Sequence, residues 1–155
     1  MKIRRAEERD VPQVLRLLHQ VLELHAKLRP DIFLSGTTKY TAEELKEILL
    51  DENRPIYVAV EDGNVLGYAF CALRSQPFSN NMVQFQSFFI DDLCVDQNVR
   101  GKGVGHLLFD FVCGEARRLH CYELTLNVWE GNDTARRFYE SLGMKPKETQ
   151  MELLL

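Results

Sequence analysis

The chain has no apolar run long enough to cross a bilayer, and it lacks internal repeats, low-complexity tracts and linkers. Its first residues, Met1–Arg5, lead directly into charged side chains without the apolar segment of a secretory signal. At 155 residues it is long enough for one domain with a substantial core and too short for two ordinary ones. We therefore expect a single domain over residues 1–155, in a cytosolic protein that does not bind membranes.

An excess of positive charge is also absent. The chain has 19 Lys and Arg against 23 Asp and Glu, for a formal net charge of −4, and its basic residues are scattered. Proteins that bind duplex nucleic acid carry a basic patch or stripe, so no nucleic-acid partner is expected. An acidic chain with one local basic loop instead suits an anionic cofactor and a cationic or neutral second substrate.

Spacings typical of a metal site are missing as well. The cysteines show no Cys-x-x-Cys motif and lie in apolar segments: Cys71, Cys94, Cys113 and Cys121. No cysteine or carboxylate stands at ligand spacing from His19, His106 or His120. We predict reduced core cysteines and no bound metal.

The spacing of apolar residues predicts the secondary structure. Strands are expected at Lys2–Ala6, Ile56–Glu61, Val65–Leu73, Gln84–Val95, Leu124–Val128 and from about Lys147, and helices at Asp10–Lys27, Thr41–Leu50, Val104–Leu119 and Asn132–Leu142. A right-handed crossover through the third helix would make its flanking strands a parallel or locally splayed pair. The element order indicates an α/β (α+β) three-layer sandwich, in which helices cover both faces of a mixed central sheet.

Local signals mark the helix ends. Asp10 and Asn132 are expected to be N-caps, and Thr41 with Glu44 forms the pattern of a capping box. Gly143 is expected in the left-handed conformation just after the last helix.

The most distinctive motif is the glycine-rich stretch Arg100-Gly101-Lys102-Gly103-Val104-Gly105, between an apolar strand and an amphipathic helix. Such a turn offers unpaired backbone N–H groups at the positive end of the helix dipole, and its two basic side chains add charge, so it can hold phosphate. A tight turn with solvated basic residues is the alternative. The spacing fits neither a P-loop nor the dinucleotide fingerprint, which needs a glycine where His106 stands.

A second motif, Asn132–Met144, follows at a distance and includes a Phe-Tyr pair on the last predicted helix. Together with Arg-x-x-Gly-x-Gly (Arg100, Gly103 and Gly105) and the preceding strand Ile90–Val95, it resembles the GNAT superfamily of acetyl-CoA-dependent N-acetyltransferases. The resemblance implies that the loop binds the pyrophosphate of acetyl-CoA. It further implies cofactor contacts through the loop, the strand before it and the last helix: Leu93, Cys94, Val95, Arg100, Gly101, Lys102, Gly103, Val104, Gly105, Asn132 and Tyr139.

Transfer of an acetyl group to an amine requires a base and a proton donor for the departing thiolate. By resemblance Tyr139 is the proton donor, whereas the helical pattern alone also fits a packing aromatic. Asp91 and Asp92 interrupt an apolar strand, and relatives often place an acidic base there. Successive strand residues point to opposite faces, so at most one is expected to face the acceptor. We favour Asp91 as the base, acting directly or through water.

The function predicted by resemblance is acetyl transfer from acetyl-CoA to a primary amine by direct attack in a ternary complex. The acceptor would be a small metabolite, such as a polyamine or an amino sugar, or a peptide amine, and its pocket would include His25, Arg29 and Asp31. A non-catalytic acyl-CoA-binding or sensing module and a general interaction domain are the alternatives. The resemblance also makes a homodimer a reasonable expectation.

Overall fold

The computed structural model describes all 155 residues. Its strands are β1 (Lys2–Arg5), β2 (Ile56–Glu61), β3 (Asn64–Ser75), β4 (Gln86–Val95) and β5 (Glu123–Leu126). Its helices are α1 (Val11–Leu28), α2 (Ala42–Leu49), α3 (Val104–Arg118) and α4 (Asp133–Ser141), with short 3₁₀ turns η1 (Glu8–Asp10) and η2 (Gln97–Val99). None of these helices is long and apolar enough to span a membrane.

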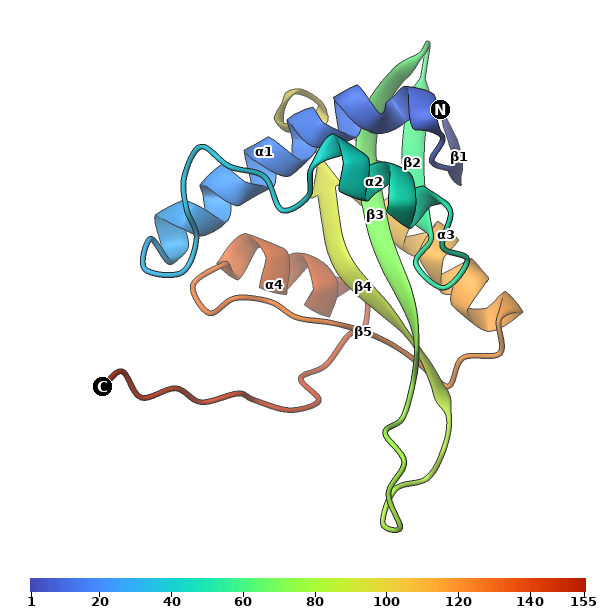
Figure 1. The fold of residues 1–155 in the computed structure, drawn as a ribbon, viewed down its shortest axis with the longest axis vertical. Coiled ribbons are helices and arrows are strands. Elements are labelled where there is room, and N and C mark those ends of the chain that lie inside the picture. The colour runs from blue at the N-terminus through green and yellow to red at the C-terminus, as the bar shows by residue number, and fades with distance from the viewer.

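One mixed sheet runs through the molecule in the order β1-β2-β3-β4-β5. The first four strands are antiparallel to their neighbours, and β5 is parallel to β4, as the crossover through α3 requires. Helices α1 and α2 lie on one face and α3 lies on the other (Figure 1). The predicted α+β sandwich with helices on both faces is confirmed.

Each face of the sheet has its own apolar core. Under α1 and α2 the core combines strand and helix side chains, among them Leu17, Leu18, Leu45, Val58 and Tyr68. Under α3 it includes Ala59, Phe88, Ile90, Leu108 and Val112. Both faces of the sheet are therefore covered by helices. Polar residues on its strands are exceptions, and we expect them to have a specific role.

Most predicted helix ends are confirmed. The Thr41 hydroxyl accepts from the Glu44 N–H at 3.2 Å, the Asn132 side chain accepts from the Ala135 N–H at 3.3 Å, and Gly143 has a φ of +94°. Asp10 does precede α1, but its side chain does not cap the helix. It accepts instead from the Glu7 N–H and pairs with Arg4 at 2.7 Å, because a buried carboxylate finds a stronger partner in a guanidinium.

The predicted last strand is wrong. After Met144 the chain is extended but belongs to no strand, and none of its backbone groups is hydrogen-bonded to the rest of the protein. Figure 1 shows this segment leading away from the sheet toward the C-terminus. A strand requires a ladder partner, and the segment does not pair with β5, the strand at the open edge of the sheet.

Candidate functional site

The site lies where β4 extends beyond its parallel neighbour. β5 pairs only with residues from Ser87 to Ile90, whereas β4 continues to Val95. On its other side β4 stays paired with β3 up to the Gly67–Val95 pair. The last five residues of β4 therefore keep one free backbone edge, along which an extended ligand can form strand-like hydrogen bonds.

The predicted phosphate loop leads from this strand into α3. No acceptor within the protein receives the backbone N–H groups from Arg100 to His106, and α3 has no side-chain cap at its N-terminus. The Arg100 and Lys102 side chains are exposed beside these amides. Free donors, the positive end of a helix of 15 residues and two cations make this loop suited to a pyrophosphate.

The glycines of the loop serve different purposes. Gly101 and Gly103 have φ near +80°, a conformation that other residues rarely adopt, and the space above both is open. A Cβ at Gly105 would instead lie 3.3 Å from the Phe138 ring and 3.4 Å from Val95. Gly105 thus allows α4 to pack closely against the first turn of α3 and the end of β4.

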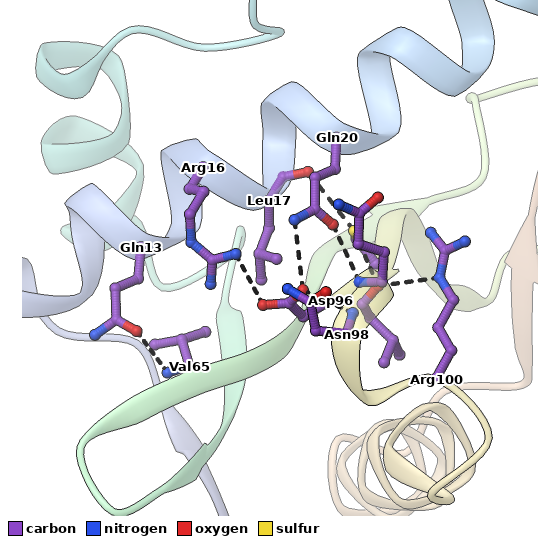
Figure 2. Close-up of polar contacts among 11 residues, drawn as sticks. Gln13, Arg16, Leu17, Gln20, Val65, Asp96, Asn98 and Arg100 are labelled. Carbon is purple, nitrogen blue, oxygen red and sulfur yellow. Dashed lines mark hydrogen bonds and ion pairs between the residues drawn. The ribbon is translucent and has the colours of Figure 1, made fainter.

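Side chains of α1 hold the segment between β4 and α3 in place (Figure 2). The buried Asp96 accepts from the Asn98 N–H at 3.1 Å and from Arg16 at 2.8 Å. The Gln20 side chain accepts from the Gln97 N–H at 3.2 Å. Burial opposes ionisation of Asp96, but these donors together hold its pKa below the ordinary value. The predicted phosphate loop is therefore anchored to a helix from a distant part of the sequence.

The two aspartates of β4 face the same side of the sheet, contrary to the expectation from strand alternation. Phe70 pairs with Asp92 and Cys71 pairs with Ile90, so Asp91 is inserted without a partner as a β-bulge. A bulge shifts the alternation by one residue, and both carboxylates then point toward the face covered by α1 and α2.

The two carboxylates have different partners. Asp91 accepts from the Lys39 ammonium at 2.9 Å and from the Tyr40 hydroxyl at 3.0 Å, and its side chain is 27% exposed. Asp92 accepts from the fully buried Tyr68 hydroxyl at 2.7 Å. Burial raises the pKa of Asp92 to about 6, against the opposing effects of the Tyr68 hydrogen bond and the Lys39 charge. Asp92 therefore titrates in the range where proton acceptors are effective near neutrality.

Tyr139 on α4 lies within the electrostatic influence of Asp92. Its ring packs against Phe138 and Phe109, with centroids 5.1 Å and 6.2 Å away. Burial, followed by the charges of Asp92 and Cys94, raises the pKa of its hydroxyl, which keeps the phenol protonated at neutral pH. Every enclosed side-chain oxygen or nitrogen has a partner, so the unbonded Tyr139 hydroxyl is reachable from solvent. The Tyr139 ring is therefore packed against other aromatic rings, whereas its hydroxyl group has no hydrogen-bond partner.

The comparisons with known proteins agree with this arrangement. The sequence model of the acetyltransferase (GNAT) family matches residues 18–144. The chain belongs to the GNAT family. The peptidyl-lysine N-acetyltransferase YjaB of Escherichia coli is 34% identical over 113 residues, which cover 73% of this chain and 64% of that protein. The thialysine N-epsilon-acetyltransferase of Bos taurus is 27% identical over 150 residues, covering 91% of this chain and 82% of that protein.

Among solved structures, the tetramutant of the BH1408 protein from Bacillus halodurans superposes with a TM-score of 0.95. It is 34% identical and covers 100% of this chain and 100% of that chain. The GNAT fold of this chain is thus shared with an experimentally determined structure over its whole length.

The remaining predicted residues lie around the same place. Leu93 and Val95 pack with the α3 core, and Asn132 caps α4. The Cys94 side chain turns toward α1, where burial and nearby carboxylates raise its pKa to about 12, so only its backbone is available to a ligand. The predicted contacts of these residues with a cofactor stay predictions.

The three residues predicted to line the acceptor pocket differ in their contacts. His25 stacks at a tilt against Phe33, 5.2 Å away, and burial lowers its pKa, with Lys39 adding to the effect. Arg29 is bound by Asp31 and Glu152, so its guanidinium is already occupied. Of the three predicted residues, His25 is the one whose pKa is shifted by burial and then by Lys39, the lysine that pairs with Asp91.

Lys39, Tyr40 and Tyr68 were missed by the sequence analysis. Tyr68 lies on a predicted strand, but its pairing with Asp92 depends on a register that no local pattern reveals. Lys39 and Tyr40 precede a capping box and read as a polar loop. A lysine next to a tyrosine at that position carries no signal of contact with residues some fifty positions later.

We predict that Asp96→Asn lowers the free energy of unfolding by about 1–3 kcal/mol, because it removes a charged partner of Arg16 and of the Asn98 N–H. The folded pKa of Asp96 is depressed, so its contribution to stability is present above the unfolded pKa and is lost as pH falls through the folded pKa. Urea unfolding at neutral and acidic pH measures both effects. The exposed Asp110→Asn is the control, and an equal change in both variants contradicts the anchoring role.

Proposed function

We propose that the protein transfers an acetyl group from acetyl-CoA to a primary amine by direct attack in a ternary complex. The observation that carries this proposal is the bulge that turns Asp91 and Asp92 toward one face of β4, with Tyr139 close enough that, after burial, the charge of Asp92 raises the pKa of the phenol. Membership of the GNAT family supports acetyl-CoA as the donor.

The residues around β4 fit acetyl-CoA. The unpaired amides from Arg100 to His106 would bind the pyrophosphate, with Arg100 and Lys102 neutralising its charge. The free edge of Leu93–Val95 would pair with the amide groups of the pantetheine arm. Asn132 and Tyr139, at the start and in the second turn of α4, would flank the far end of that arm.

The chemistry divides among three side chains. Acetyl-CoA supplies the activated acyl carbon. Asp91 would hold the incoming ammonium, and Asp92 would accept one of its protons, directly or through water, which leaves the neutral amine that attacks the acyl carbon. Tyr139 would donate a proton to the departing thiolate, and the second proton lost from the nitrogen as the amide forms would restore the phenol. A carboxyl pKa of about 6 leaves Asp92 ionised at neutral pH, while the raised pKa of Tyr139 keeps its proton available.

The acceptor we propose is an alkylamine on a flexible chain. Lys39 shows that such an ammonium fits against Asp91, because its Nζ lies 2.9 Å from the carboxylate. A hollow of about 290 Å³ is lined by Tyr40, Ile48 and Arg54 and by three acidic residues, Glu44, Glu47 and Asp51. This setting favours a cationic acceptor such as a polyamine or a lysine side chain. Relatives from E. coli and cattle are named for peptidyl-lysine and thialysine.

The proposed activity is tested with a panel of amines, following the release of free thiol from acetyl-CoA. Tyr139→Phe retains the ring and removes the proton donor, so kcat is expected to fall on the order of 10² to 10⁴ while CoA affinity and stability change little. Tyr122→Phe, at an exposed tyrosine, is the matched control.

Wild-type turnover in Tyr139→Phe would remove this residue from the mechanism. Bound CoA without turnover on any amine would favour a non-catalytic acyl-CoA sensor instead.

The roles of the aspartates are separated by their pH profiles. Asp92→Asn should lower kcat on the order of 10² or more and abolish a fall in kcat/KM that wild type shows as pH drops through about 6. Asp91→Asn should raise KM for the amine with a smaller change in kcat, since it weakens ammonium binding.

Asp62→Asn, in the turn between β2 and β3, is the control for loss of a carboxylate. If the acidic limb disappears in Asp91→Asn and persists in Asp92→Asn, then Asp91 is the base, as the sequence analysis favours.

A further inference from the structure

Lys39 lies in the connection between α1 and α2 (Figure 1). Its Nζ donates to Asp91 at 2.9 Å, so its ammonium sits on the carboxylate to which we assign the acceptor. Lys46, the next lysine along the chain, pairs instead with Glu8 at 3.6 Å. A primary amine of the chain itself therefore occupies the position that the proposed function gives to the substrate.

The charge of Lys39 also acts on the proposed proton acceptor. After burial and the hydrogen bond from Tyr68, it is the next influence on the pKa of Asp92. Burial disfavours the charged form of Lys39, but the hydrogen bond and charge of Asp91 leave its pKa above the ordinary value. Lys39 is therefore an ammonium that must lose a proton before it can react, and Asp92 is a base within its electrostatic reach.

The backbone beside Lys39 is anchored, whereas its side chain is long and partly exposed. Tyr40 stacks on Phe70 with ring centroids 5.5 Å apart and donates to Asp91 at 3.0 Å. The Lys39 side chain is 44% exposed, and ion pairs with this degree of exposure are weak. Its amine can therefore leave the carboxylate while staying tethered at the site, which gives it a high effective concentration there.

We propose that Lys39 is itself an acceptor, and that acetyl-CoA bound to the chain acetylates its Nζ within the same chain. This inference rests on the proposed function and names a substrate for the same site.

The transfer follows the proposed chemistry with Lys39 as the amine. Asp92 takes one proton from the ammonium, directly or through water, and the neutral Nζ attacks the acyl carbon. A C–N bond forms as the C–S bond breaks. Tyr139 protonates the departing thiolate, the second proton lost from the nitrogen restores the phenol, and Asp92 releases its proton to water.

The product differs from the lysine in charge. An acetylated Nζ is a neutral amide and no longer forms an ion pair with a carboxylate. Asp91 would then lose one of its two side-chain partners and keep the Tyr40 hydroxyl. The modification would thus free Asp91 for the ammonium of a separate acceptor molecule.

Mass spectrometry of the purified chain with acetyl-CoA and no free amine tests the transfer. One acetyl group per chain is expected at Lys39, on the order of tenfold or more faster than at the exposed Lys46, because Lys39 is held at the site. The rate constant should not change on dilution, since donor site and acceptor belong to one chain. Lys39→Arg keeps a cation but should gain no group, whereas the control Lys46→Arg should gain it as wild type does.

Two changes show whether the bound cofactor and the ion pair are required. Excess desulfo-CoA, which competes for the cofactor site, and Asp91→Asn, which removes the partner of Lys39, should each slow the acetylation. Acetylation of Lys39 that survives either change, or whose rate constant rises with protein concentration, overturns the inference. Turnover of free amines without acetylation of Lys39 also overturns it but leaves the proposed function standing. Absence of both reactions refutes the proposed function itself.

Lys39→Gln tests the freeing of Asp91, because its side chain is a neutral amide like that of an acetylated lysine. It should lower KM for a free amine about twofold to fivefold, the factor that a weak ion pair contributes, with little change in kcat. Lys46→Gln is the matched control and should behave as wild type. An unchanged or higher KM in Lys39→Gln would contradict the release of Asp91 by acetylation.

Discussion

Because Asp91 is inserted into β4 without a partner on β3, the strand presents two successive carboxylates to one face of the sheet. In a regular strand one of them would lie in the apolar core under α3, where an unpaired charge is costly. The bulge places Asp91 by Lys39 and Tyr40, and Asp92 by Tyr68. The amine-binding and proton-accepting roles proposed for the site both require this local change of alternation.

The end of β4 also links the two ligands that we propose. Its free edge begins where β5 stops pairing, after Ile90, and the bulge lies at that same point. One short stretch of backbone can therefore bind a pantetheine arm along its edge while its carboxylates face the acceptor. Tyr139, whose pKa is raised by burial and then by the charges of Asp92 and Cys94, comes from α4, which packs close to α3 because residue 105 is a glycine.

Helix α1 connects the proposed cofactor loop with the proposed acceptor side. Arg16 and Gln20 hold the turn that precedes the loop (Figure 2). Farther along the same helix, burial lowers the pKa of His25, and the Lys39 charge adds to this effect. A rigid helix that contacts both sides limits how far they can move apart. The positions of loop and carboxylates thus depend on contacts between residues about 80 positions apart, such as Arg16 and Asp96.

Features set by nearby residues could be predicted from the sequence, and features set by pairing could not. The capping box at Thr41, the cap at Asn132 and the left-handed Gly143 are local, and each is confirmed. The bulge at Asp91 depends on the register between β3 and β4, which the pattern of either strand alone does not reveal. The sequence predicts a strand after Met144, yet the backbone of that segment forms no hydrogen bonds with the open edge of β5 or with any other strand.

The most direct test of the site is an NMR titration of the amide-labelled protein with CoA. The account predicts that the largest amide shifts fall on Arg100–His106 and Leu93–Val95, since these backbone groups would bind the pyrophosphate and the pantetheine arm. Amides of β1 and β2, at the far side of the sheet, should change little. Largest shifts outside the β4–α3 region, or no shifts with a folded protein and excess CoA, would contradict the account.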